Sequence, residues 1–146
     1  MVAVYEDCTH KLGKEVVNAI TSTYSGSNEE QAIVAGLDAY FGALEDSRVS
    51  RICMLELEAI SPEVTQLCYR HMGGFAQMMI VLANYAYPDW TLNSKEKEVV
   101  AISLVGALRQ SATVWLLEDY KSQRSTLVSA SSKLFLGMIA LHKTQK

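Results

Sequence analysis

The sequence predicts an all-α fold, a bundle of six helices that forms a single domain over residues 1–146. Apolar residues recur at the three- and four-residue spacing of a helix face in six segments. No segment alternates apolar and polar residues for long enough to predict a strand. With 49% apolar residues, eight glycines and two prolines, the composition is typical of a compact, ordered protein.

The first two helices are predicted on either side of a turn at Ser25-Gly26-Ser27. A four-residue apolar spacing predicts a first helix of about six turns, with Val4, Cys8, Leu12, Val16 and Ile20 on one side. After the turn, we expect Asn28 to cap a helix whose first turn holds Glu29 and Glu30. The buried side of this second helix is expected to contain Ile33, Leu37, Tyr40, Phe41 and Leu44.

The other four helices are predicted from their capping residues and from the prolines. Ser61 and Pro62 predict the start of the fourth helix, because serine caps well and proline suits the first helical position. The predicted ranges are Ser47 to about Ala59, Pro62 to about Tyr87, Ser94 to about Tyr120 and Thr126 to about His142.

The charge and the cysteine content of the sequence reduce the number of functions to consider. Thirteen Lys and Arg against sixteen Asp and Glu give a net charge of −3 without any basic run, so the chain alone is not expected to bind nucleic acid. The start does not resemble a secretory signal, and the longest wholly apolar stretch, Met78 to Ala83, is too short to cross a membrane. Three widely spaced cysteines favour free thiols, and we expect a cytoplasmic protein with no membrane partner.

The predicted fifth helix is apolar around almost its whole circumference. In a chain of this size we expect one side to meet a second subunit, so that the last two helices of each chain form a four-helix homodimer interface. A central core helix is the alternative. The expected interface residues are Leu104, Val105, Leu108, Ala112, Trp115, Leu116, Leu127, Leu134, Phe135, Met138 and Leu141.

The predicted fourth helix carries an apolar stripe rich in methionine and aromatic residues. Methionine adapts to irregular shapes, so this stripe suits the wall of a pocket for a small apolar molecule, although an ordinary core stripe is the alternative. Polar contacts to such a molecule are expected from the third, fourth and fifth helices. The expected ligand-binding residues are Cys53, Glu56, His71, Phe75, Met78, Met79, Leu82, Ser103 and Gln110.

Two polar residues interrupt apolar faces and need partners. Glu56 falls on the buried side of the third helix and His71 on the stripe of the fourth. If these helices pack as an antiparallel pair, the two side chains could meet, and each would favour the charged form of the other. A structural ion pair without any role in ligand binding is the alternative.

Sequence motifs for catalysis are missing: there is no Gly-rich phosphate loop, nucleophile elbow, HExxH motif or pair of carboxylates on a predicted cleft. We therefore do not expect an enzyme; a small helical enzyme with His71 and Glu56 as acid and base is a weaker reading. Cys68 and His71, with Cys8 or Cys53, could in principle hold a metal ion. Single Cys and His residues on apolar faces are usually core residues, so no metal or other cofactor is expected.

Two stretches carry a family resemblance. MLELEAISPEV, from Met54 to Val64, places an acidic residue near the end of one helix before a Ser-Pro-Glu start to the next. AISLVGALRQSATVWLL, from Ala101 to Leu117, combines Leu-Val-Gly-Ala with Trp-Leu-Leu. Both resemble the effector-binding domain of TetR/AcrR-type bacterial transcription regulators. Glu56 matches the family's acidic residue and Pro62 its helix start, whereas Arg109 replaces a residue that is usually small and polar.

The resemblance implies a homodimer formed by the last two helices and a pocket among the preceding ones for a small, usually apolar effector. In the family, an N-terminal helix-turn-helix domain binds operator DNA; AVYEDCTHKLGKEV, from Ala3 to Val16, resembles the connecting helix with that domain missing. We therefore expect this chain to be the effector-binding and dimerisation domain of a TetR-like regulator, and we expect that regulator to be a repressor. The alternative is a stand-alone helical carrier of small apolar molecules.

Overall fold

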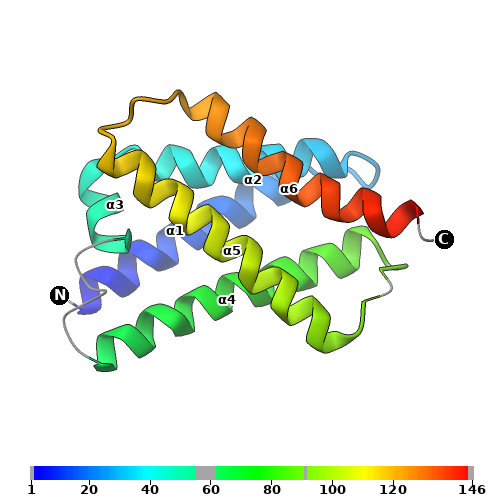
Figure 1. Ribbon diagram of the computed structural model, residues 1–146, viewed down its shortest axis with the longest axis horizontal. Coiled ribbons are helices and arrows are strands. Elements are labelled where there is room, and N and C mark those ends of the chain that lie inside the picture. Colours follow the sequence, from blue (N-terminus) through cyan, green and yellow to red (C-terminus); the bar gives the residue numbers. More distant parts are fainter. Residues whose placement is uncertain (1, 55–61, 91, 145–146) are drawn as a thin grey trace.

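The structure, a computed structural model, describes residues 2–54, 62–90 and 92–144. Within these ranges it contains six helices and no strand, which confirms the predicted all-α class. The helices are α1 (Val2–Thr23), α2 (Glu29–Leu44), α3 (Ser47–Met54), α4 (Pro62–Ala86), α5 (Ser94–Leu117) and α6 (Arg124–Thr144). Figure 1 shows α2 and α6 along one side of the bundle, α4 along the other, and α5 crossing from one side to the other.

Most helix limits agree with the expected ones, and the main difference is at the end of α5. The helix ends at Leu117 because Asp119 and Tyr120 both adopt the left-handed conformation, with φ of 57°, which stops helix propagation. α6 starts at Arg124, two residues earlier than expected. The predicted end of the third helix, beyond Met54, lies outside the described residues.

An asparagine precedes both α2 and α5, but only the asparagine before α5 caps its helix. Asn93 caps α5: its side-chain oxygen accepts a hydrogen bond from the backbone N–H of Glu96 at 2.9 Å. The helix itself begins at Ser94, as predicted. Asn28 occupies the N-cap position of α2, but its side chain turns back to the end of α1, where it accepts from Ser25 N–H and donates to the carbonyl of Thr23.

The main hydrophobic core joins α1, α2, α3, α5 and α6. Phe41 of α2 is at its centre with no exposed surface, and its ring packs edge to face on Trp115 of α5, with the ring centroids 6.0 Å apart. The indole N–H of Trp115 donates to the carbonyl of Ser122, which attaches the turn after α5 to the core. The other buried members of this cluster are Leu12, Leu37, Leu44, Cys53, Ala112 and Val128.

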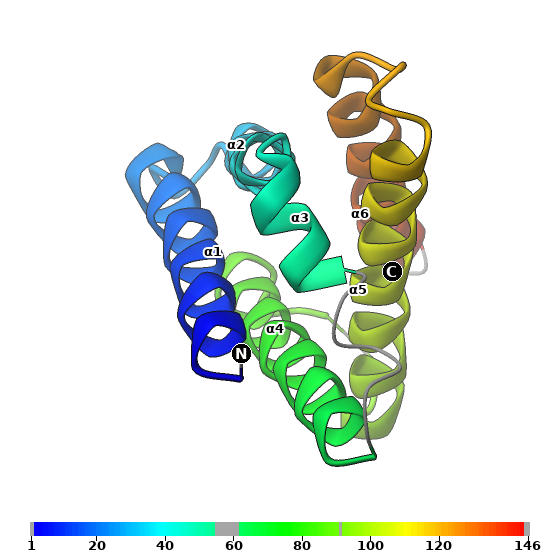
Figure 2. The ribbon, with the colours of Figure 1, turned by 90° about the vertical axis from the view of Figure 1, so that its left-hand side faces the viewer.

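A second, smaller cluster attaches α4 to the rest of the bundle. It consists of Ala76 and Ile80 of α4 with Ala101 and Val105 of α5, and the two alanines allow the helices to approach closely. Phe75 packs against both clusters. Figure 2 shows α4 below α2, with α1 on one side of it and α5 on the other. The space between α4 and the main core is where the pocket described below lies.

The α5 residues that were expected from the sequence at a subunit interface face the interior of their own chain. Ala112 and Trp115 are only 1% and 3% exposed, and Val105 and Leu116 are also buried, all by their own chain. Leu104 and Leu108 lie beside the pocket instead. The face that reaches the surface is the opposite one, on which Leu117 is 67% exposed. That exposed face contains Val99, Ile102, Ser103, Gln110, Val114 and Leu117.

The α6 residues expected at the interface are divided between the interior and the surface. Phe135 and Met138 line the pocket, and Leu127 packs against the main core, so these three point into the chain's own interior. Leu134 is exposed, as an interface residue would be. The side chain of Leu141 lies outside the described part of the chain.

The composition of α5 also meets the length and hydropathy expected of a membrane span, and it is the one such helix among the described residues. This is weak evidence, since the apolar helix of a helical bundle has the same composition. In the fold, one side of α5 carries Trp115 into the core and Ala101 against α4.

Candidate ligand-binding pocket

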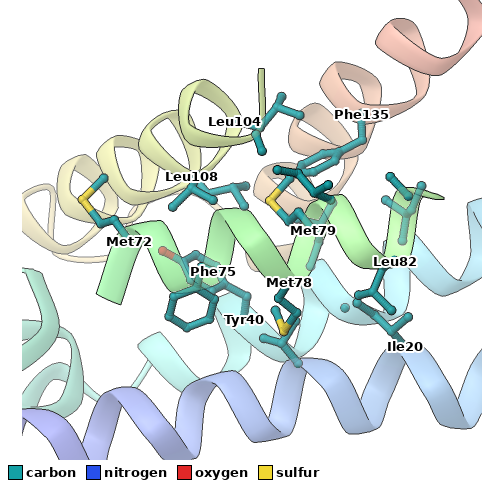
Figure 3. Close-up of a pocket in the computed structure, with 18 of the residues that line it drawn as sticks. Ile20, Tyr40, Met72, Phe75, Met78, Met79, Leu82, Leu104, Leu108 and Phe135 are labelled. Carbon is teal, nitrogen blue, oxygen red and sulfur yellow. The ribbon is translucent and has the colours of Figure 1, made fainter. Parts of the chain in front are cut away.

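An apolar cavity of about 210 Å³ lies between α4 and the other long helices. The α4 wall carries the side chains of the methionine-rich stripe, and Figure 3 shows Met79 beside Phe135 of α6 and Leu82 beside Ile20 of α1. Further apolar side chains come from every described helix except α3. They include Leu12, Val16, Ile33, Leu37, Met72, Ile80, Val100, Leu104, Val105, Leu108 and Met138.

Two ring pairs, one from α1 and one from Tyr24 directly after it, contact α4 at the two ends of the pocket. Tyr5 and His71 pack edge to face with their ring centroids 5.3 Å apart, and Tyr24 and Tyr85 do so at 5.9 Å. α1 and α4 therefore run in the same direction, with the pocket beside them. Between the two pairs, the ring of Phe75 approaches the Cα of Gly13 closely enough that a Cβ there would lie 3.6 Å away.

Polar side chains gather at the end of the pocket nearest α3. Tyr5 and Thr9 of α1, Cys53 of α3 and His71 of α4 all line this end. Thr9 is only 7% exposed, and its hydroxyl makes no hydrogen bond of ordinary length and angle with a described residue, although it lies near enough to the Tyr5 phenol and the Cys53 thiol to lower the pKa of both. Nε2 of His71, which is also buried, likewise makes no such hydrogen bond with a described residue. Such atoms are uncommon in folded proteins, and each needs an explanation.

Arg109 and Tyr40 add a cation and a phenol close to this end. Both line the pocket, and Tyr40 lies beside Phe75 in Figure 3. Burial raises the pKa of the Tyr40 phenol, and the positive charge of Arg109 offsets only part of that increase. Burial likewise raises the pKa of the Cys53 thiol to about 11, against smaller opposite effects of the Thr9 hydroxyl and then of Arg109. The Tyr40 phenol and the Cys53 thiol at this end of the pocket are therefore stabilised in their neutral forms.

The opposite end of the pocket has a different polar composition. Tyr24, Glu29, Tyr87 and Trp90 line it, from the region where α1 ends, α2 begins and α4 ends. Burial raises the pKa of the Tyr87 phenol, and the nearby carboxylate of Glu29 raises it further. The carboxylate of Glu29 therefore places a negative charge at this end of the pocket, whereas Arg109 places a positive charge at the α3 end.

Six of the nine predicted ligand-binding residues lie together in this pocket: Cys53, His71, Phe75, Met78, Met79 and Leu82. Ser103 and Gln110 do not line it, because they are on the exposed face of α5; the hydroxyl of Ser103 donates to the carbonyl of Val99 instead. Glu56 lies outside the described residues, as does its proposed contact with His71.

Sequence reasoning missed Thr9, Tyr40 and Arg109. A signal for Arg109 was present, since it is the single charged residue between Val99 and Leu117 on a helix that is otherwise apolar or small and polar. A lone cation in such a helix needs a specific environment. Thr9 and Tyr40 had no comparable signal, because each looks like an ordinary member of an amphipathic helix.

The thiols and imidazole do not assemble into a metal site in the part of the chain that the structure describes, where no group of three His, Cys, Asp or Glu residues has suitable geometry. Cys68 is buried against Tyr5 and Leu67, while His71 faces the pocket. The three cysteines are free thiols. The arrangement can enclose an apolar molecule and offer it a few polar atoms at one end.

Comparison with models of known protein families gives no match to this chain, and comparison with curated proteins gives no match either.

Proposed function

We propose that this chain is the effector-binding and dimerisation half of a TetR-like transcriptional regulator. The observation that carries the proposal is the apolar cavity of about 210 Å³ with polar atoms concentrated at its ends. Cavities of this kind bind small apolar or amphipathic molecules. The resemblance of Met54 to Val64 and of Ala101 to Leu117 to regulators of that family supports the choice of function.

Support for a homodimer comes from the outer face of α5. Val99, Ile102, Val114 and Leu117 are exposed there, and Leu134 of α6 is exposed as well. Large apolar side chains gathered on one helix face favour burial against a partner. A second copy, related by a two-fold axis, would cover this face with its own α5 and α6.

The contact between α4, which lines the pocket, and α5, which carries the proposed dimer face, gives a route for regulation. α4 packs directly on α5 through Ala76, Ile80, Ala101 and Val105, so a ligand that moves α4 also acts on the helix that carries the outer face. α1 and the residue after it, Tyr24, are joined to α4 by the two ring pairs. A ligand that binds one dimer geometry better than another shifts their populations, and in a longer protein it would alter operator binding.

Ligand binding is tested with the neutral apolar probe N-phenyl-1-naphthylamine, whose fluorescence rises in apolar sites. We expect saturable binding with one probe per chain. Leu104→Trp, which fills the pocket from α5, should abolish this binding. Val81→Trp, at an exposed position of α4 outside the pocket and the proposed dimer face, is the control and should leave it unchanged. Equal binding by both variants, or none by the wild type, would contradict the proposal.

The dimer is tested by sedimentation velocity. Leu117→Lys should convert a dimer into a monomer, whereas Val81→Lys, on an exposed part of α4, should not. A wild-type monomer that still binds the probe would instead favour the carrier function, because a carrier has no need of a symmetric partner.

A further inference from the structure

We propose that the pocket selects a neutral amphipathic molecule with a hydroxyl or carbonyl oxygen, which Thr9 and His71 hold at the α3 end. The inference depends on the proposed small-molecule binding and adds the chemical class of the ligand. It is built on two buried polar atoms at that end, Oγ1 of Thr9 and Nε2 of His71, neither of which makes a hydrogen bond of ordinary length and angle with a described residue. The Thr9 hydroxyl has the Tyr5 phenol and the Cys53 thiol as polar neighbours.

The hydroxyl of Thr9 differs from those of four other helical residues and, like that of Ser50, makes no hydrogen bond of its own within the helix. Those of Thr21, Ser103, Ser111 and Thr113 each donate to the carbonyl four residues earlier, at 2.7 to 2.9 Å. This bond is the usual way to satisfy a hydroxyl within a helix. Thr9 is nevertheless buried, lines the pocket and lacks such a bond. A molecule in the cavity could therefore give this hydroxyl a better-placed partner than the nearby Tyr5 phenol or Cys53 thiol.

His71 and Thr9 are at the same place in the pocket because both adjoin Tyr5. The imidazole packs on the Tyr5 ring, and Thr9 follows Tyr5 by one turn of α1. An unmade hydrogen bond on a buried polar atom costs about 1–3 kcal/mol. One ligand oxygen with two lone pairs could accept from both groups, and a hydroxyl could alternatively donate to Nε2.

Neutrality of the ligand follows from the low polarity around these atoms. Burial is the largest cause of the raised pKa values of Tyr5, Tyr40 and Cys53, and for the last two it outweighs the charge of Arg109. A carboxylate placed there would lose its hydration in the same way. A cation is disfavoured both by that loss and by Arg109. The apolar part of the ligand would then extend along Phe75, Met78 and Met79.

The experiment displaces N-phenyl-1-naphthylamine with four eight-carbon compounds that differ in their polar group: octan-1-ol, octan-2-one, octanoate and octylammonium. We expect the alcohol or the ketone to bind at least about tenfold more tightly than either ion, which corresponds to about 1.4 kcal/mol. The stronger of the two neutral compounds identifies the hydroxyl or the carbonyl as the preferred group.

Thr9→Val, which keeps the shape and removes the hydroxyl, should weaken binding of that compound about five- to tenfold while leaving probe affinity unchanged. Thr21→Val, at an exposed site on the same helix, is the matched control and should have no effect. The free Thr9→Val protein should be at least as stable to urea as the wild type, because the variant removes an unsatisfied hydroxyl.

Octanoate or octylammonium as the strongest ligand would overturn this inference while leaving the proposed function intact. Equal affinity of Thr9→Val and wild type for the neutral compounds, or a marked loss of stability in Thr9→Val, would overturn it as well. If neither the probe nor any of the four compounds binds the wild type, the proposed function fails and the inference fails with it.

Discussion

The hydroxyl of Tyr120 donates a hydrogen bond to the backbone carbonyl of Leu44 at 2.9 Å. The bond joins the turn after α5 to the last residue of α2, and the Tyr120 ring also packs edge to face on Trp115 with the ring centroids 4.8 Å apart. Tyr120 reaches this position because its backbone is in the left-handed conformation, with φ of 57°. The cost of that conformation, about 1–2 kcal/mol, is offset by the two contacts.

Tyr120→Phe should therefore reduce the free energy of unfolding by about 1–2 kcal/mol, because the carbonyl of Leu44 loses its side-chain donor while the ring contact remains. Urea unfolding followed by Trp fluorescence measures the loss. Tyr69→Phe, at an exposed position, serves as the control and should be neutral. Equal stability of the two variants would show that the bond contributes nothing.

Phe41→Ala should destabilise the fold strongly, by about 3–5 kcal/mol, because it leaves a cavity where the main core is fully buried. The matched control is Val34→Ala on the same helix, whose side chain is exposed and should matter little. Chemical unfolding of both variants tests this. A small effect of Phe41→Ala would mean that the core cluster around Trp115 is not the stabilising centre of the bundle.

Gly36→Ala and Gly74→Ala should have opposite effects. A Cβ on Gly36 would come within 2.7 Å of Ile20 Cγ1, so α1 and α2 must move apart or Ile20 must shift, at a cost of about 1–3 kcal/mol. A Cβ on Gly74 meets open space, and alanine is the better helix former there by about 0.5–1 kcal/mol. Ile20→Ala added to Gly36→Ala should recover part of the loss. Additive effects would contradict the close approach.

Stability should fall at alkaline pH. Burial raises the pKa of the Cys53 thiol from its usual 9.0 to about 11, so the folded state favours the protonated thiol. Its contribution is complete below pH 9 and is lost as the pH rises from 9 toward 11, at up to about 1.4 kcal/mol per pH unit. The buried phenols of Tyr5 and Tyr40 shift in the same direction. Cys53→Ala should flatten the curve of unfolding free energy between pH 9 and 10, and an unchanged slope would contradict this assignment.

The sequence predicted the α4 wall of the pocket and missed the side chains opposite it. Phe75, Met78, Met79 and Leu82 repeat at helical spacing, so a single helix places them on one face. Thr9 and Arg109 join the pocket only because α1 and α5 lie on either side of α4, and no local pattern indicates that arrangement.

Helix existence and type were determined by the sequence alone, because apolar spacing, capping residues and prolines act over a few residues. Which face of α5 turns inward was decided only by the tertiary structure. Both faces are apolar, so periodicity does not distinguish them, and the inward face is the one whose Trp115 fits against Phe41 and Tyr120. The fit of side chains between helices that are distant in the sequence determined which face of α5 is buried. As a result, Ser103 and Gln110 lie at the surface, and Leu104 and Leu108 line the pocket.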